Sequence, residues 1–242
     1  MSKNKIYDIL IIILLDIGLS CLPFGLIPIS LSWIYIFQII AQFLTFFLIK
    51  LVLKKSQLIC EKKECNSKLI PLFIPIFLVC FSNFFCLFDS ANSLCLDINF
   101  ESILRIVLSI CVAFNEEVIF RTLLLNNMNK ESPSLFRIVL SSAIFAACHL
   151  THFFSSFNPG DLIVVAYTFG IGIILGMIYL YTGSFIWAFI FHALYNVANS
   201  VLTSEWIAGR SSFYLVNIIV TVVAAVYLTL IYFFKLKSEK EA

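Results

Sequence analysis

Charged residues are scarce in this sequence. Lys and Arg number 16 and Asp and Glu number 14 among 242 residues, whereas 61% of the chain is hydrophobic and its mean hydropathy is +1.02. A soluble domain carries about a quarter of its residues as charges to keep its surface hydrated, so this composition excludes one. The net charge of +2 gives no support for a nucleic-acid partner, and none is expected. The lipid bilayer is the expected surrounding.

Several familiar motifs are also missing. The eight cysteines include no C-x-x-C pair and most lie in apolar runs, so neither a disulfide framework nor a thiolate zinc site is favoured. No H-E-x-x-H motif of a single-helix zinc protease occurs. No polar stretch is long enough for a second domain, so residues 1–242 are expected to form a single integral membrane domain.

Eight apolar runs of about 20 residues predict an all-α fold, a polytopic bundle of about eight transmembrane helices. Asp16 interrupts the first run and no convincing cleavage site follows it, which favours a retained helix over a signal peptide. Lys and Arg gather at one side of this eight-span arrangement, so both termini are predicted to be cytoplasmic. The runs lie near residues 6–22, 31–53, 69–88, 102–125, 138–154, 162–181, 184–203 and 212–234.

The fourth run contains charges that a membrane helix normally avoids. A charged side chain at the centre of such a helix costs roughly 2.5–3.5 kcal/mol, so each needs a partner or a purpose. Glu117 and Arg121 are four residues apart and can pair on one helix face. Glu116 points about 100° away from that face. The pattern predicts one neutralised carboxylate beside a second that is free to act.

The three histidines, His149, His152 and His192, all lie in predicted membrane helices. His149 shares a helix face with Phe145, and His192 shares one with Asn196. Counted from the cytoplasmic ends of their helices, both His149 and His192 lie roughly 13–18 Å deep, and Glu116 lies at the same depth. The three helices can therefore bring two imidazoles, an amide and a carboxylate into one cavity.

This set of ligands suits zinc, and a catalytic zinc site keeps one position open for water. A free carboxylate beside such a site can take the proton of the water that attacks a peptide carbonyl. Two other interpretations remain open. The Glu117–Arg121 pair and the histidines can serve as interhelical contacts in a structural role, or they can relay protons in a transporter.

Three motifs, in this order and spacing, resemble those of the CPBP family of intramembrane metalloproteases, also called the CAAX-protease or Abi family. They are E-E-x-x-x-R at residues 116–121, F-x-x-x-H at residues 145–149 and H-x-x-x-N at residues 192–196, and the similar region covers residues 102–200. The resemblance implies a metalloendopeptidase that cleaves a membrane-associated peptide or protein. It leaves open whether the substrate is prenylated, and the oligomeric state is not indicated.

The resemblance also implies roles for the residues of the motifs. Glu116 is expected to activate the water, and Glu117 with Arg121 to order the site. A divalent metal, with Zn²⁺ as the favoured ion, is expected to be held by the three residues His149, His192 and Asn196. His152 lies outside the pattern. Asp16 is expected to serve as a helix contact or as a group close to water, with a gate for the substrate as the alternative.

Composition and family together suggest a setting. The abundance of Phe, Ile, Lys and Asn indicates an AT-rich genome, so a multi-pass protein of the bacterial plasma membrane is expected. Bacterial relatives are linked to peptide maturation or to self-immunity against bacteriocins. The alternative function is therefore a bacteriocin immunity protein that binds its target without cutting it.

Overall fold

The computed structural model describes residues 3–20, 29–55, 66, 69–81, 99–151, 154, 157, 159–200 and 211–233. Every regular element within these residues is helical, which confirms the predicted all-α class. The α-helices are α1 (Lys3–Ser20), α2 (Leu31–Lys55), α3 (Ile70–Phe77), α5 (Phe100–Glu117), α6 (Ser134–Cys148), α8 (Pro159–Thr182), α9 (Phe185–Ser200) and α11 (Ser211–Ile231). A 3₁₀ turn, η3 (Leu78–Phe81), extends α3, and a π-helix, η5 (Val118–Leu125), extends α5.

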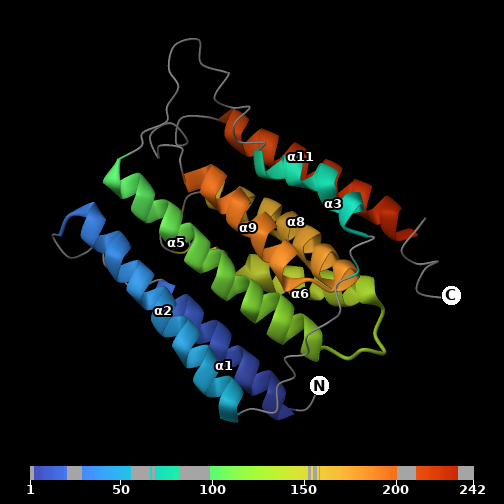
Figure 1. The fold of residues 1–242 in the computed structure, drawn as a ribbon. Helices are drawn as coiled ribbons and strands as arrows, with labels where there is room; N and C mark the ends of the chain where they lie inside the picture. The colour runs from blue at the N-terminus through green and yellow to red at the C-terminus, as the bar shows by residue number, and fades with distance from the viewer. Residues whose placement is uncertain are drawn as a thin grey trace.

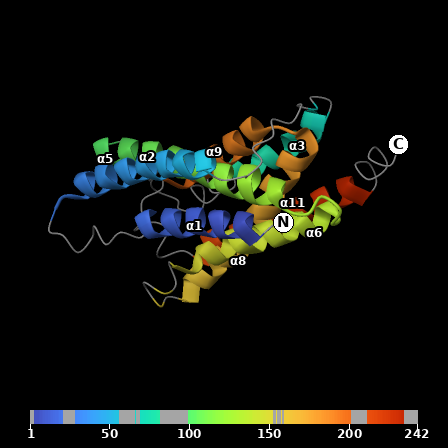
Figure 2. The same cartoon turned by 90° about the horizontal axis from the view of Figure 1, so that it is seen from below.

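The helices run side by side in a bundle (Figure 1). Seen from below, α2, α5 and α9 form one layer, while α1, α6 and α8 lie in the other (Figure 2). The π-helix η5 continues α5 and contacts α1, α6 and α8, so it packs against the second layer. Both views place the beginning of α1 and the end of α11 toward the same end of the bundle.

The observed helices coincide with the eight predicted apolar runs wherever the structure describes them. Two of them, α2 and α8, are long and apolar enough to cross a membrane, while α6 and α11 are apolar but shorter. The helices α1 and α5 carry several charged residues each, which lowers their hydropathy below that of an ordinary span. The second half of the third run, residues 82–88, lies outside the described residues.

The fifth helix ends earlier than predicted. The sequence placed His149 inside a helix over residues 138–154, but α6 ends at Cys148 and His149 is its C-cap, with Leu150 and Thr151 helical again after this interruption. The ring nitrogen Nδ1 of His149 donates a hydrogen bond to the carbonyl of Phe145, at 3.1 Å. In a continuing α-helix, the backbone N–H of His149 would donate to this same carbonyl. That N–H turns instead to the carbonyl of Ala146, at 3.0 Å.

Two clusters of buried apolar side chains hold the bundle together. The larger one joins α3, α8, α9 and α11, with Ile174, Leu175 and Leu228 fully buried. The smaller one joins α1 to η5 and α6 through Ile9, Ile12 and Phe145 among others. Many large apolar side chains, such as those of Phe43 and Val223, are exposed on the outside of the bundle.

Candidate active site

Helix α5 carries the two adjacent glutamates at its C-terminal end. A capping box fixes its beginning, because the side chain of Asn99 accepts from the N–H of Ser102 and the hydroxyl of Ser102 accepts from the N–H of Asn99. After Glu117 the chain continues as the π-helix η5, in which backbone hydrogen bonds join residues five apart instead of four apart. π-helical turns are rare and occur frequently at functional sites. Glu116 and Glu117 thus lie where the helix changes type.

Glu117 and Arg121 form an ion pair in the interior. The Arg121 Nε and Glu117 Oε2 atoms are 3.1 Å apart, and both side chains are 0% exposed. The guanidinium carbon also lies 5.0 Å from the centre of the Phe145 ring. No acceptor among the described residues is aligned with the guanidinium N–H groups. Attraction between the opposite charges is therefore the main stabilisation of this arginine.

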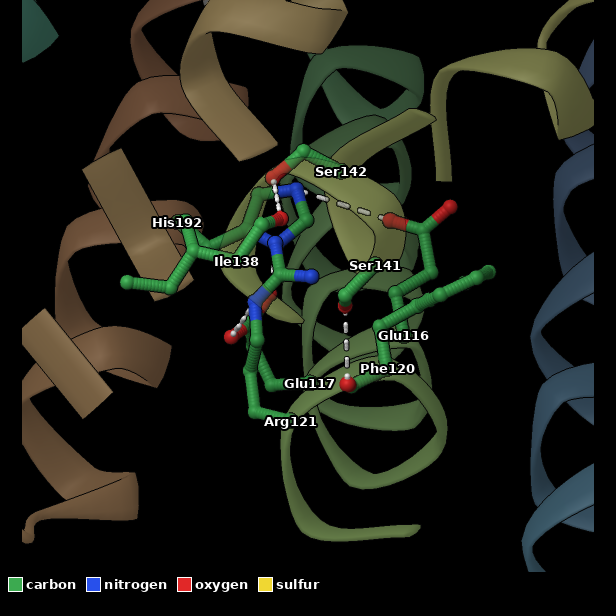
Figure 3. Close-up of polar contacts among 8 residues, drawn as sticks. All are labelled: Glu116, Glu117, Phe120, Arg121, Ile138, Ser141, Ser142 and His192. Atoms are coloured by element: carbon green, nitrogen blue, oxygen red, sulfur yellow. Dashed lines mark hydrogen bonds and ion pairs between the residues drawn. The ribbon is translucent and has the colours of Figure 1, made fainter. Parts of the chain in front are cut away.

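His192 on α9 lies between the two glutamates (Figure 3). Its Nδ1 atom is 2.9 Å from Glu117 Oε1, and its Nε2 atom is 3.5 Å from Glu116 Oε2. The sequence predicted that Glu116 lies at the same depth as His192, but it left this carboxylate without an ion-pair partner. In the structure this carboxylate, at 15% exposure, has His192 at ion-pair distance. One imidazole therefore links both carboxylates.

A tight corner between α8 and α9 brings His192 to this position. Gly183 has a φ of 69°, a left-handed conformation that glycine adopts without strain. The hydroxyl of Thr182 accepts from the N–H of Ser184, and the hydroxyl of Ser184 accepts from the N–H of Trp187. These bonds satisfy backbone groups at the start of α9 and set its direction against α5.

The second histidine approaches from α6. Ser141 of this helix donates to the carbonyl of Phe120 in η5, at 3.3 Å, which fastens α6 to the π-helix (Figure 3). The ring of Phe145 is edge-on to both imidazoles, with its centroid 5.0 Å from that of His149 and 5.9 Å from that of His192. The two histidines therefore flank one aromatic ring.

The remaining predicted residues are less closely associated. Asn196 lies one turn after His192 on α9 and is half-buried. His152 lies outside the described residues. The structure thus brings Glu116, Glu117, Arg121 and His192 into one connected group, with His149 beside it.

A small cavity lies between α1, α5 and α6. Its volume is about 90 Å³, and Glu116 and His149 both line it. Helix α1 adds Asp16 and Ser20 to the same cavity, although the first apolar run carried no motif. The sequence predicts Asp16 as a helix contact, a group close to water or a gate, and does not indicate that this side chain lines a cavity with Glu116.

A chain of amide and hydroxyl groups connects this cavity to α2. The side-chain amide of Asn115 donates to both the backbone carbonyl and the side-chain oxygen of Gln42, each at 2.8 Å. The Gln42 amide in turn donates to the hydroxyl of Ser20, at 3.0 Å. Sequence reasoning missed this network. Its signal was the glutamine pair Gln38 and Gln42, spaced one turn apart in a largely apolar stretch of α2.

The donor atoms of the site fit a metal in type. Zinc-binding histidines commonly donate one ring N–H to a carboxylate or a backbone carbonyl and bind the metal through the other nitrogen. His192 has Nδ1 on Glu117 and His149 has Nδ1 on the carbonyl of Phe145, so a metal would be bound through Nε2 of each ring. Within the described residues, no group of three or more His, Cys, Asp or Glu side chains is arranged to hold a metal ion.

Residues 99–198 match a family model described as type II CAAX prenyl endopeptidase Rce1-like. The predicted family resemblance is confirmed. The matched region extends from the cap of α5 almost to the end of α9 and contains all three motifs. The helices α1, α2, α3 and α11 lie outside it. No curated protein matches the chain. Endopeptidase activity is therefore what the family of the site region implies.

Proposed function

We propose that this protein is an intramembrane metal-dependent endopeptidase that cleaves a membrane-associated peptide or protein. One observation carries the proposal. Glu116 is at ion-pair distance from His192 and lines the same cavity as His149, so a carboxylate and two imidazoles from three helices meet beside a space for water. The Rce1-like match of the same three helices supports the reaction class.

The charges around Glu116 support its role as the general base. Glu117 is already paired with Arg121 and also faces His192, so it holds the imidazole in position. Glu116 faces the cavity, where its carboxylate takes a proton from the attacking water and can return it to the leaving amine. His149, His192 and Asn196 would hold Zn²⁺, which supplies a Lewis acid that polarises the scissile carbonyl and the water.

The outside of the bundle supports a membrane setting. Large apolar side chains are exposed on several helices, among them Phe43 and Phe47 of α2 and Val222 and Val223 of α11. Exposed apolar surface of this extent is stable in lipid rather than in water. We infer a multi-pass protein of the bacterial plasma membrane with eight spans and both termini in the cytoplasm. Its substrate then approaches from the bilayer or from its cytoplasmic surface.

Zinc content tests the metal part of the proposal. Purified wild type, loaded with a slight excess of Zn²⁺ and desalted, is expected to retain about one ion per chain. The double variant His149→Ala/His192→Ala is expected to retain none while keeping its helical circular dichroism. Equal metal in the two folded proteins would contradict this set of ligands.

A comparison of peptides tests the chemistry. Membranes containing the wild type are expected to release peptides that membranes with Glu116→Gln do not, as measured by mass spectrometry at matched protein levels. Loss of a general base lowers the rate by roughly 10²- to 10⁴-fold. If Glu116→Gln released the same peptides at the same rate, the endopeptidase mechanism would be wrong. Protection against a bacteriocin that survived this substitution would instead support an immunity protein that acts by binding.

A further inference from the structure

We propose that Asp16 of α1 belongs to the cation-binding site and that it acts on the divalent cation through water in the cavity. This inference rests on the proposed function, because the cation is the one that the metalloendopeptidase would use. It adds to the site a residue that lies outside both the three motifs and the Rce1-like match.

The first argument is the environment of Asp16. Its side chain is 9% exposed, and no described residue forms a hydrogen bond or an ion pair with it. A buried carboxylate is costly unless a partner compensates it. The carboxylate lines the small cavity, so this space is where a partner can be supplied.

The second argument is that the position of Asp16 is fixed on both sides. One turn before it, Ile12 and Ile13 of α1 pack into the apolar cluster with η5. One turn after it, Ser20 accepts a hydrogen bond from Gln42, which is itself bound by Asn115 beside the glutamates. Polar bonds of this kind fasten helices to each other in a membrane. Helix α1 therefore holds its carboxylate at the level of Glu116.

The size of the cavity indicates what binds there. A volume of about 90 Å³ has room for a few water molecules, each needing about 30 Å³ in the liquid. A small hydrated ion fits this space.

The charges around the cavity indicate the sign of that ion. Its lining contains the carboxylates of Asp16 and Glu116 and no Lys or Arg among the described residues. Arg121 is already paired with Glu117, outside the cavity lining. Carboxylate oxygens together with the imidazole of His149 are ligands and second-shell partners typical of divalent transition metals. The cavity thus favours a divalent cation over an anion.

Zinc affinity of the purified full-length chain in detergent tests the inference, measured by competition with a chromophoric chelator. Asp16→Asn is expected to weaken Zn²⁺ binding by roughly 10- to 100-fold, the range for residues that support metal ligands from outside the first shell. Asp16→Glu keeps the charge and is expected to recover most of the affinity. Asp8→Asn is the matched control, because it makes the same change two turns earlier on α1, outside the cavity lining, and is expected to leave the affinity unchanged.

The outcomes separate this inference from the proposed function. If the wild type binds zinc, the His149→Ala/His192→Ala variant does not, and Asp16→Asn binds as the wild type does, then only the role of Asp16 is wrong. If the wild type itself binds no zinc, the metal of the proposed function is wrong and the inference falls with it. Should Asp16→Asn unfold, the zinc affinity of Asp16→Glu is compared with that of the control Asp8→Asn. A zinc affinity of Asp16→Glu below that of an Asp16→Ser variant would overturn the inference.

Discussion

The two sides of the bundle are held together by different interactions. On the side of α3, α8 and α11, the buried contacts are mainly apolar. Hydrogen bonds between the helices include Tyr195 of α9 donating to Asn217 of α11 at 2.7 Å and Tyr227 of α11 donating to the carbonyl of Leu72 in α3 at 3.1 Å. On the side of α1, α2 and α5, buried amides, hydroxyls and carboxylates connect the helices. The site faces this second side. The contrast indicates that apolar packing dominates one side, while the other side combines a smaller apolar cluster with buried polar groups.

The largest expected effect comes from breaking the ion pair on the polar side. Glu117→Gln leaves Arg121 as an uncompensated buried charge, so we expect a loss of roughly 3–5 kcal/mol in the free energy of unfolding. Denaturant unfolding of the purified protein in detergent measures it.

The neighbouring glutamate provides the control for that experiment. Glu116→Gln makes the same chemical change one residue earlier on a partly exposed side chain, and it is expected to change stability by less than about 1 kcal/mol. The double variant Glu117→Gln/Arg121→Met is expected to recover part of the loss, since an apolar replacement needs no counter-charge. Equal losses for Glu116→Gln and Glu117→Gln would mean that the two glutamates do not differ as described.

The fold could be predicted from the sequence to a large extent. The eight apolar runs identified the helices because burial in lipid or in a core requires the same long apolar segments. The end of α6 could not be predicted, since it depends on His149 competing for the carbonyl of Phe145. The π-helix could not be predicted either, because hydropathy is insensitive to which residue a backbone N–H reaches.

The apolar side gives the next effect in size. Leu175→Ala removes a fully buried side chain from the larger cluster, and we expect a loss of roughly 2–5 kcal/mol in stability. Retained zinc per folded chain is expected to stay at the wild-type value, because α8 contributes no residue to the cavity. Metal loss in folded Leu175→Ala protein would show that the two sides are not separable.

The smallest expected effect concerns the amide network between α2 and α5. A double-mutant cycle of Asn115→Ala and Gln42→Ala is expected to give a coupling energy of roughly 0.6–1.7 kcal/mol, the range for side-chain hydrogen bonds between membrane helices. The two variants bury no new charge, so chemical unfolding is a suitable measurement. A coupling near zero would mean that this network does not join the helices energetically.

The site itself could be predicted in part. The spacing of Glu117 and Arg121 indicated their pair, and the depth argument placed Glu116 near His192. Asp16 was recognisable as an isolated charge, but its place beside the glutamates depends on how α1 packs against η5. That packing depends on how isoleucine and leucine side chains far apart in the sequence fit together. A hydropathy pattern along the chain contains no information about this fit.

The π-helix has a consequence for the tolerance of this chain to insertions and deletions. Six of its eight residues are buried, and they meet α1 and α6 on different sides. Removing one residue between 118 and 125 would favour ordinary α-helical turns and rotate everything before it relative to everything after it. The glutamates would then face away from α9 while the leucines kept their places in the core, although the hydropathy profile would hardly change.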